Sequence, residues 1–280
     1  MSPRTRVGFV GLGNIGKPMA LRLAAAEGIE LTVYDVAPDP VAELERAGAH
    51  VAASVADLAG RVEVLCVMVR DDDQVRDVLG EVLGVGREDL TVVIHSTVAP
   101  NTPGQLEDIA GRHGVRVLDA PVSGGAMGAA DGSLAILVGG SEDAFLAAQP
   151  ALDAMGAKVV HAGPIGAGTK FKLARNMMHF VAFTAATEAQ RLAEAAGLDL
   201  VELGKVVRHT DAITGGPGAI MHRNTTAPIA KDDFWHGVFE HVTALGEKDL
   251  TFAIALADEL GVDVPLAREA LPRLGKGLGT

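Results

Sequence analysis

A glycine-rich segment that directly follows a short apolar run constrains this chain more than any other feature of its sequence. Residues 7–10 read Val-Gly-Phe-Val, residues 11–16 read Gly-Leu-Gly-Asn-Ile-Gly, and a helical pattern follows. In the spacing G-x-G-x-x-G, the first glycine permits a tight turn, the second lets the backbone approach a pyrophosphate, and the third lets the helix pack on the strand. Alone, the motif is equally compatible with a glycine turn that binds no ligand. Together with the next strand, it predicts a dinucleotide site at Gly11, Leu12, Gly13, Asn14, Ile15 and Gly16.

The second apolar run ends in an acidic residue that bears on the choice of dinucleotide. Residues 31–34 are followed by Asp35, which lies 19 residues after Gly16. A carboxylate at this position can accept hydrogen bonds from both ribose hydroxyls and would repel a 2′-phosphate. Residues 36–38 read Val-Ala-Pro and offer no arginine that could hold such a phosphate. The sequence therefore predicts NAD in preference to NADP, with a plain turn role for Asp35 as the alternative.

Short apolar runs alternate with helical patterns as far as residue 163, and only helical patterns follow. Such alternation indicates a mostly parallel, doubly wound α/β sheet of the Rossmann type. We expect a dinucleotide-binding domain at residues 1–164 and an all-helical substrate and dimerisation domain at residues 165–280, joined by a long helix. The expected strands are residues 7–10, 31–34, 62–69, 92–94, 115–118, 134–138 and 158–160. The expected helices are residues 15–27, 41–47, 73–83, 105–112, 141–155, 169–196, 200–209, 217–224, 238–260 and 266–274.

The composition of the chain limits the kinds of binding partner and the cellular compartment that we expect. The 280 residues carry 24 basic and 36 acidic side chains, a formal charge of −12, which disfavours nucleic acid and anionic membranes as partners. No apolar stretch is long enough to span a bilayer, and Asn14 and Lys17 interrupt the N-terminal run too early for a signal peptide. The single cysteine, Cys66, lies in an apolar run, so we expect it to pack in the core and the protein to be cytoplasmic.

A loop of small residues follows a later strand. Asp119-Ala120-Pro121 ends the strand, and the chain continues as Val-Ser-Gly-Gly-Ala. Backbone N–H groups of such a loop, together with a serine hydroxyl, can bind a carboxylate at the sheet edge where α/β proteins bind ligands. A flexible glycine loop without a ligand is the alternative. We therefore predict substrate binding by Ser123, Gly124 and Gly125.

Lys172 and Asn176 lie four residues apart on the predicted long helix and so share one of its faces. The helix is strongly apolar around them, so we expect it to be buried with its polar stripe facing a cleft. A partly buried lysine has a lowered pKa and can take the proton of a hydroxyl whose hydride goes to a nicotinamide ring. We predict this catalytic role for Lys172, with Asn176 orienting the groups. The alternatives are a solvated Lys172 beside Lys170, and His179 as the base, although a packed helix residue describes His179 more simply.

Four segments together resemble the β-hydroxyacid dehydrogenase family, over essentially the whole chain. They are VGFVGLGNIGKPMA at residues 7–20, DAPVSGGAMGAADGSLAILVGG at residues 119–140, GAGTKFKLARN at residues 166–176, and the pattern Lys-Asp-Leu at residues 248–250. The resemblance implies an oxidoreductase with a nicotinamide cofactor, and its spacing selects Lys172 over Lys170. It also implies cofactor contacts from Met68, Val69, Asp73, Thr97 and Lys248. For Lys248, a plain surface cluster with its acidic neighbours is the alternative.

The chain departs from the family pattern at several positions. His95 replaces the usual acidic residue before Ser-Thr, and Val69 and Arg70 replace a common proline-containing turn. Arg175 stands where the catalytic helix often carries a first asparagine, and residues 210–236 also diverge. These differences do not change the expected class of reaction, but they leave the identity of the substrate open. We expect no metal site, because paired carboxylates are missing near the irregularly spaced His222, His236 and His241.

The combined prediction is an NAD-dependent dehydrogenase that converts a small 3-hydroxy carboxylic acid, such as 3-hydroxyisobutyrate, to the semialdehyde. The apolar helices of the second half predict a homodimer or homotetramer, as the resemblance also implies. Three alternatives stay open. Imine reductases share a similar cofactor domain but usually lack a lysine at the position of Lys172. A 6-phosphogluconate dehydrogenase needs a larger helical domain and a basic cluster, and a non-catalytic scaffold would have lost the lysine.

Overall fold

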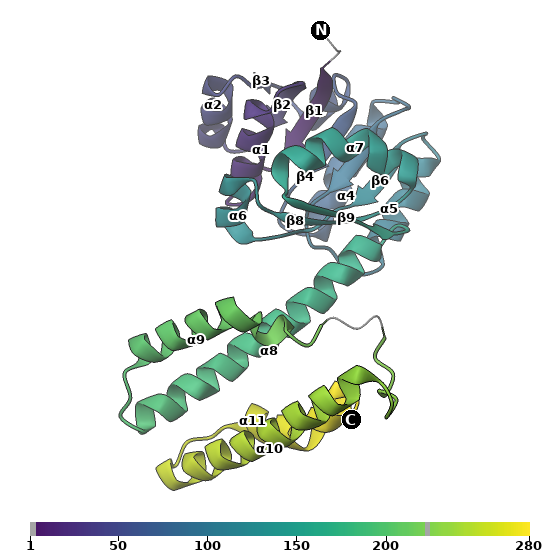
Figure 1. Ribbon diagram of the computed structural model, residues 1–280. Helices are drawn as coiled ribbons and strands as arrows, with labels where there is room; N and C mark the ends of the chain where they lie inside the picture. Colours follow the sequence, from purple (N-terminus) through teal and green to yellow (C-terminus); the bar gives the residue numbers. More distant parts are fainter. Residues whose placement is uncertain (1–3, 222–224) are drawn as a thin grey trace. The chain divides into compact units, whose positions relative to one another are not determined.

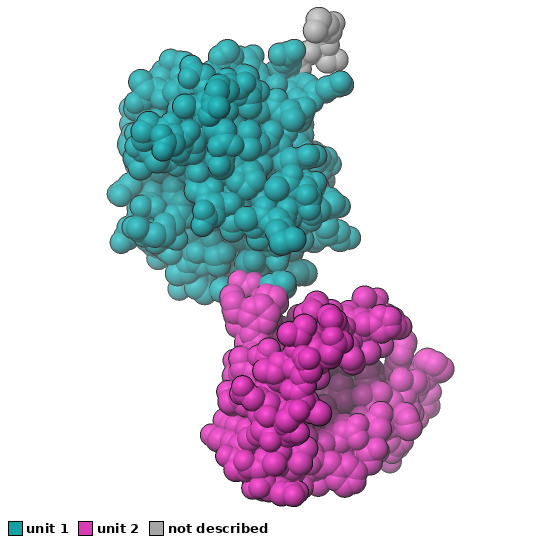
Figure 2. Space-filling view, turned by 90° about the vertical axis from the view of Figure 1, so that its left-hand side faces the viewer, with its two compact units in different colours: residues 1–175 teal, residues 176–280 magenta. Residues whose placement is uncertain are grey.

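The computed structural model describes residues 4–221 and 225–280 of the chain. The chain forms two compact units, residues 1–175 and residues 176–280, which Figure 2 shows in different colours. The division falls inside a long helix, whereas the sequence placed the expected boundary between residues 164 and 165. The first two turns of this helix therefore belong to the α/β unit.

Among its described residues, the first unit has one nine-stranded sheet with the order β3-β2-β1-β4-β5-β6-β8-β7, and β9 pairs with β8. The neighbours from β3 to β6 are parallel, and β8 is antiparallel to β6 and β7 but parallel to β9. The chain order reverses at β1, which lies between β2 and β4. The strands are β1 (Thr5–Val10), β2 (Ile29–Tyr34), β3 (His50–Val51), β4 (Val64–Val67), β5 (Thr91–Ile94), β6 (Arg116–Asp119), β7 (Val122–Ser123), β8 (Ala135–Gly139) and β9 (Lys158–Gly163).

Helices cover both faces of this sheet (Figure 1). Phe9 and Cys66 belong to the core under α1, α2, α6 and α7, and Val10 and Val67 belong to the core under α3, α4 and α5. Because successive strand residues point to opposite faces and both faces are covered, the strands read as continuous apolar runs. These helices are α1 (Gly16–Ala25), α2 (Pro38–Arg46), α3 (Val55–Ala59), α4 (Asp72–Gly84), α5 (Thr102–Gly111), α6 (Gly125–Asp131) and α7 (Glu142–Met155).

The second unit contains only helices among its described residues. Gly197, in the left-handed region at φ 72°, follows the end of α8, and the Asp199 side chain accepts hydrogen bonds from the first backbone N–H groups of α9. None of the helices in the described ranges is both long and apolar enough to cross a membrane. The elements are α8 (Ala167–Ala195), which begins in the first unit, α9 (Leu200–Thr214), η1 (Gly216–Gly218), α10 (Phe234–Leu260), α11 (Pro265–Ala270), η2 (Leu271–Arg273) and α12 (Leu274–Leu278).

The structure confirms the predicted fold class, a doubly wound α/β sheet followed by helices joined through one long helix. Five short elements were not predicted: β3, β7, α3, α6 and α12, of which α12 shares only its first residue with the helix expected at residues 266–274. Each is too short for a periodic pattern to develop, and α6 is rich in glycine and alanine. For the helix predicted at residues 217–224, the described residues 217–221 contain only the end of the 3₁₀ turn η1, and residues 222–224, with His222, lie outside the described ranges.

A buried carboxylate fixes the start of α8 against the sheet. Asp119, the last residue of β6, is fully buried. Its Oδ1 accepts a hydrogen bond of 2.7 Å from the backbone N–H of Gly166, and its Oδ2 accepts one of 2.6 Å from that of Thr169. The first N–H groups of a helix have no partner within the helix, so a carboxylate stabilises them by hydrogen bonding and by its charge. Asp119 therefore determines where α8 leaves the sheet.

We predict that Asp119→Ala lowers the free energy of unfolding by about 3 kcal/mol, because two buried backbone N–H groups lose a charged acceptor. Urea unfolding followed by circular dichroism measures the change. The matched control is Asp108→Ala, an exposed aspartate on α5, which should change the free energy of unfolding by less than about 0.5 kcal/mol. Equal effects of the two substitutions would contradict the role assigned to Asp119.

Candidate functional site

The three glycines of the loop after β1 have three different surroundings. Gly11 has φ +92°, and a Cβ there would lie 2.2 Å from the carbonyl oxygen of Met68. A Cβ on Gly16 would lie 1.9 Å from the carbonyl oxygen of Gly11. Both positions therefore require glycine for the loop to fold. A Cβ on Gly13 would meet nothing within 4 Å, so this glycine leaves open space on which a ligand can lie.

A cavity of about 340 Å³ lies at the carboxyl end of the sheet, next to this loop. It is placed where the strand order reverses beside β1, which is where doubly wound sheets bind ligands. Five of the predicted cofactor residues line it, namely Gly11, Gly13, Asp35, Met68 and Val69. Sequence reasoning did not assign the other lining residues, which are Val10, Tyr34, Val36, Val55, Arg70, Gln74, Asp77, Val78 and Glu81. Leu12, Gly13 and Asn14 line a second hollow, which adjoins the first cavity at Gly13.

Asp35 joins the end of β2 to the glycine loop. Its Oδ2 accepts a hydrogen bond of 2.5 Å from the backbone N–H of Leu12, and its Oδ1 accepts one of 2.8 Å from that of Ala37. A carboxylate has about four acceptor positions, so these two bonds leave capacity for ligand hydroxyls. Asp35 thus holds the loop and lines the cavity at the same time.

A serine that the sequence analysis did not single out connects the ends of β4 and β5. The Ser96 hydroxyl accepts a hydrogen bond of 2.9 Å from the N–H of Val69 and donates one of 2.7 Å to the carbonyl oxygen of the same residue. Ser96 is buried, so the bonds are shielded from water. They hold the Met68–Val69 wall of the cavity in place. Thr97, the next residue, is exposed and does not line this cavity.

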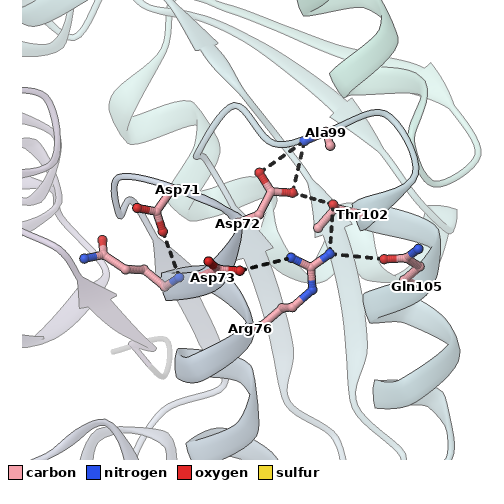
Figure 3. Close-up of polar contacts among 8 residues, drawn as sticks. Asp71, Asp72, Asp73, Arg76, Ala99, Thr102 and Gln105 are labelled. Atoms are coloured by element: carbon pink, nitrogen blue, oxygen red, sulfur yellow. Dashed lines mark hydrogen bonds and ion pairs between the residues drawn. The ribbon is translucent and has the colours of Figure 1, made fainter.

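A second polar network fixes the loop after β5 to the start of α4 (Figure 3). Asp72 accepts hydrogen bonds from the N–H of Ala99, with 3.1 Å to Oδ1, and from the Thr102 hydroxyl. Arg76 donates to Thr102 Oγ1 at 3.3 Å and to the side chain of Gln105 at 3.2 Å. Asp73, the residue that the resemblance implicated, instead lies beside Arg76 at 3.8 Å and is exposed. In this acidic turn, Asp71 caps α4 by accepting a hydrogen bond of 3.0 Å from the N–H of Gln74, and Asp72 joins α4 to the loop after β5, while Asp73 is exposed.

His95, one of the departures from the family pattern, is a buried and neutral residue. Its Nδ1 lies 2.9 Å from the carbonyl oxygen of Ala120, and its ring stacks on that of Phe9 at a centroid distance of 6.3 Å. Burial lowers its pKa to about 4. In its neutral form, Nδ1–H donates to Ala120 and ties β5 to the segment that leads to Ser123.

The predicted substrate loop follows β6 and begins in the two-residue strand β7. Val122 and Ser123 pair with β8, and the backbone then turns through Gly124 at φ 134° and Gly125 at φ 63°. Two successive residues in this region require glycine. Gly124 and Gly125 are exposed, and a Cβ on Gly125 would meet nothing within 4 Å. The loop thus places two exposed glycines next to the half-buried Ser123, with open space beside Gly125.

Lys172 reaches this loop from the second turn of α8. Its side chain is buried, with a relative exposure of 8%, and its Nζ donates a 2.6 Å hydrogen bond to the carbonyl oxygen of Val122. Burial, and next to it the charge of Arg175, lower the pKa of Lys172 below its ordinary value. The structure therefore brings Lys172 next to Ser123 within the first unit, whereas Lys170 is exposed.

The remaining predicted residues belong to the second unit or to the core. Asn176 is the first residue of the second unit and lies on α8 four positions after Lys172, and Lys248 lies on α10, where its Nζ is 3.2 Å from Asp249. His179 packs against the rings of Phe180 and Phe183. Cys66 is buried, and burial raises the pKa of its thiol to about 12, which fits core packing. Within residues 4–221 and 225–280, no three histidine, cysteine or acidic side chains gather as a metal site would require.

Comparison with known proteins identifies relatives over the whole chain. Residues 6–163 match the family profile described as the NAD binding domain of 6-phosphogluconate dehydrogenase, and residues 166–274 match the one described as NAD-binding of NADP-dependent 3-hydroxyisobutyrate dehydrogenase. An uncharacterized oxidoreductase of Mycobacterium tuberculosis is 49% identical over 98% of this chain and 93% of its own length.

Solved structures agree with these matches. A crystal structure from Mycobacterium avium 104, named in general terms as an oxidoreductase, has a TM-score of 0.94 and 47% identity, and covers 98% of both chains. The 3-hydroxyisobutyrate dehydrogenase of Mycobacterium tuberculosis, with L-serine, has a TM-score of 0.69 and 32% identity over 98% of this chain and 93% of that one. An imine reductase from Pseudomonas sp. has a TM-score of 0.77 at 19% identity, covering 99% of this chain and 96% of that one, a likeness of fold alone. The chain belongs to the β-hydroxyacid dehydrogenase family and is an oxidoreductase with a domain that binds a nicotinamide dinucleotide.

Proposed function

We propose that this protein is an NAD-dependent dehydrogenase that oxidises a small 3-hydroxy carboxylic acid of the 3-hydroxyisobutyrate class to its semialdehyde. One observation carries the proposal. The buried Lys172 side chain donates a hydrogen bond to the carbonyl oxygen of Val122, which directly precedes the loop of Ser123, Gly124 and Gly125. A proton-accepting amine and a loop of small residues that can bind a carboxylate are the two parts that oxidation of a hydroxy acid requires.

The lining of the cavity beside the glycine loop supports NAD as the cofactor. Gly13 leaves room for a pyrophosphate, and the Asp35 carboxylate is available to ribose hydroxyls. Asp77 and Glu81 also line the cavity, and its arginine, Arg70, is paired with Asp71 at 3.0 Å. This excess of negative charge disfavours the 2′-phosphate of NADP. The name of the second family profile, by contrast, refers to an NADP-dependent enzyme.

In the proposed mechanism, Ser123 and the backbone N–H groups of Gly124 and Gly125 bind the substrate carboxylate. Lys172, in its neutral form, accepts the proton of the hydroxyl group, and its hydrogen bond to Val122 keeps the amine oriented toward the loop. A nicotinamide dinucleotide held by the glycine loop and Asp35 would supply the hydride acceptor for the carbon that bears this hydroxyl group. Asn176 would hydrogen-bond the substrate or the lysine without changing the charge of the site. In the reverse direction, Lys172 returns the proton.

Imine reduction is the second candidate, because imine reductases share the fold. The lysine favours the dehydrogenase, since the resemblance associates imine reductases with its loss. A non-catalytic scaffold would likewise have no need of a buried amine, whose burial costs free energy. Turnover of any hydroxy acid would exclude the scaffold.

We expect the protein to oxidise at least one acid among 3-hydroxyisobutyrate, 3-hydroxypropionate, D-glycerate, L-serine and 4-hydroxybutyrate, faster with NAD than with NADP. In Lys172→Ala, the rate should fall by at least about a hundredfold, as is typical when an acid–base group is removed. Initial rates followed through reduced cofactor absorbance measure both effects.

Lys170→Ala is the matched control, because it removes an exposed lysine from the same helix, and it should keep nearly the full rate. Unchanged rates in Lys172→Ala would remove Lys172 from the mechanism. A preference for NADP would contradict the role of Asp35 in binding the ribose hydroxyls and repelling a 2′-phosphate.

The proposed position of the cofactor predicts separate effects on binding and folding. Gly13→Val should leave the free energy of unfolding within about 0.5 kcal/mol, because the side chain enters open space, yet it should weaken NADH binding at least about tenfold. Gly111→Ala, at the far end of α5, serves as the control and should leave binding unchanged. Calorimetric titration gives the affinities; a Gly13→Val variant with full affinity would exclude the pyrophosphate from this loop.

We also propose that the chain assembles as a homodimer or homotetramer through the second unit. Large apolar residues are exposed there, including Met177 at 69%, Ile213 at 71%, Phe234 at 78% and Phe252 at 65%. So many large apolar side chains left in water within one unit are typical of a surface that another chain covers. Sedimentation equilibrium should give at least twice the chain mass of 28.8 kDa, and a single 28.8 kDa species at micromolar concentration would contradict the proposal.

A further inference from the structure

One wall of the cavity beside the glycine loop is a stripe of side chains from α4. Asp77, Val78 and Glu81 lie three, four and seven residues after Gln74, so the four share one face of the helix, and all of them line the cavity. We propose that Gln74 and Asp77 bind the adenine base of the cofactor. The Gln74 amide donates a hydrogen bond to a ring nitrogen, and the Asp77 carboxylate accepts one from the amino group. The inference rests on the proposed placement of the dinucleotide.

The other walls of the cavity place the base beside α4. Asp35, which lines the same cavity, stands where doubly wound sheets hold the ribose of the adenosine half of a dinucleotide. The apolar side chains of Val55 and Val78 line the cavity too and can cover the faces of a flat ring. Val36, also in the lining, is 90% exposed, so a ring bound here would remove apolar surface from water. The cavity therefore combines a ribose acceptor with apolar walls, as binding of a nucleoside requires.

A hydrogen bond to the backbone fixes the orientation of the Gln74 amide. Its Oε1 accepts a hydrogen bond of 3.0 Å from the N–H of Arg70. An N–H group needs an acceptor, so the amide oxygen faces Arg70 and the amide nitrogen is left for another partner. Within the described part of the chain, no group accepts a hydrogen bond from that nitrogen. Gln74 therefore offers N–H donors beside the cavity, and the unprotonated ring nitrogens of a purine are acceptors.

Asp77 supplies the opposite polarity one turn further along α4. Three residues span about 4.5 Å of a helix axis, and the turn at residues 68–70, from which α4 follows, lies against the glycine loop. Gln74 is therefore nearer the ribose side than Asp77. Asp77 is exposed, and among the described residues it forms no ion pair, since Arg76 lies beside Asp73. An ionised carboxylate only accepts hydrogen bonds, and the amino group, a donor, is the polar group of adenine farthest from the ribose.

This order of donor and acceptor predicts discrimination between adenine and hypoxanthine. Hypoxanthine carries a carbonyl oxygen in place of the amino group, so two acceptors would face each other at Asp77. A site built to accept a hydrogen bond from a donor rejects the analogue that lacks the donor. The ring nitrogens on the ribose side are the same in both bases. Asp77 therefore sets the choice of base, whereas Gln74 strengthens the binding of both.

The test is calorimetric titration of the full-length protein with NADH and with its analogue in which hypoxanthine replaces adenine. The native protein should bind NADH about fivefold more tightly than the analogue, the change expected for one hydrogen bond. In Asp77→Asn, this ratio should fall to nearly one, because an amide can accept from the amino group or donate to the carbonyl oxygen. Asp108→Asn is the matched control, since Asp108 is exposed on α5 and does not line the cavity, and it should keep the native ratio.

Two substitutions of Gln74 separate base binding from the shape of the turn. Gln74→Leu removes both hydrogen bonds and should weaken binding of both nucleotides about fivefold, with an unchanged ratio. Gln74→Glu keeps an acceptor for the N–H of Arg70 but offers no donor, so it should weaken binding at least as much. Gln149→Leu, on α7 at the other face of the sheet, should bind both nucleotides as the native protein does. Circular dichroism checks that each variant is folded.

Equal affinities of the native protein for the two nucleotides would overturn the inference, and so would a native ratio in Asp77→Asn. Full affinity for NADH in Gln74→Glu would overturn the role of the Gln74 amide. None of these measurements requires turnover. A protein that shows the expected ratios but oxidises none of the tested hydroxy acids would support the inference and contradict the proposed function, so the two failures remain distinguishable.

Discussion

The buried carboxylate of Asp119 is the interaction on which the candidate site depends. A fully buried carboxylate needs hydrogen-bond donors to replace the water that it has lost. Asp119 finds these donors in two backbone N–H groups at the start of α8. Gly168 lets the helix come this close, because a Cβ there would lie 2.0 Å from the carbonyl oxygen of Leu137. Lys172 follows one turn later and reaches β7 only because the helix begins at this place. The geometry of the amine is thus set by residues that have no chemical role of their own.

The cavity beside the glycine loop depends in the same way on hydrogen bonds between loops. Asp35 ties the glycine loop to the end of β2, and Ser96 ties the end of β4 to the loop after β5. Asp72 extends this connection to α5 through Ala99 and Thr102. All these bonds lie at the carboxyl edge of the sheet, where the strands end and only loops remain to form walls. A rigid sheet and short loops that are bonded to one another together give a preformed site.

The sequence was sufficient to predict a structural feature where a residue type, in its pattern, has only one physical explanation. The alternation of apolar runs predicted the sheet, and glycine spacing predicted the loop that the structure builds from Gly11 and Gly16. The roles of Asp119 and Ser96 could not be found this way, because each depends on partners 27 or more residues away in the chain. A signal existed for Asp119, since an acidic residue at the end of an apolar strand must have buried partners. Nothing in the sequence separates Asp72 from Asp73, whose roles differ only through the position of the loop after β5.

The distribution of charge within the first unit bears on how an acidic protein would bind the anionic substrate that we propose. The chain carries a formal charge of −12, and Asp35, Asp77 and Glu81 contribute acidic groups to the cavity by the glycine loop. The second and third turns of that unit's last helix carry Lys172 and Arg175 instead, and no described carboxylate pairs with Lys172. An anion bound beside Lys172 would relieve the repulsion between these two cations, so in the proposed mechanism carboxylate binding would be coupled to proton transfer. A substrate carboxylate would stabilise the protonated lysine, which opposes the neutral base. Burial and Arg175 act in the opposite direction, and their sum decides whether the amine remains neutral once the acid is bound.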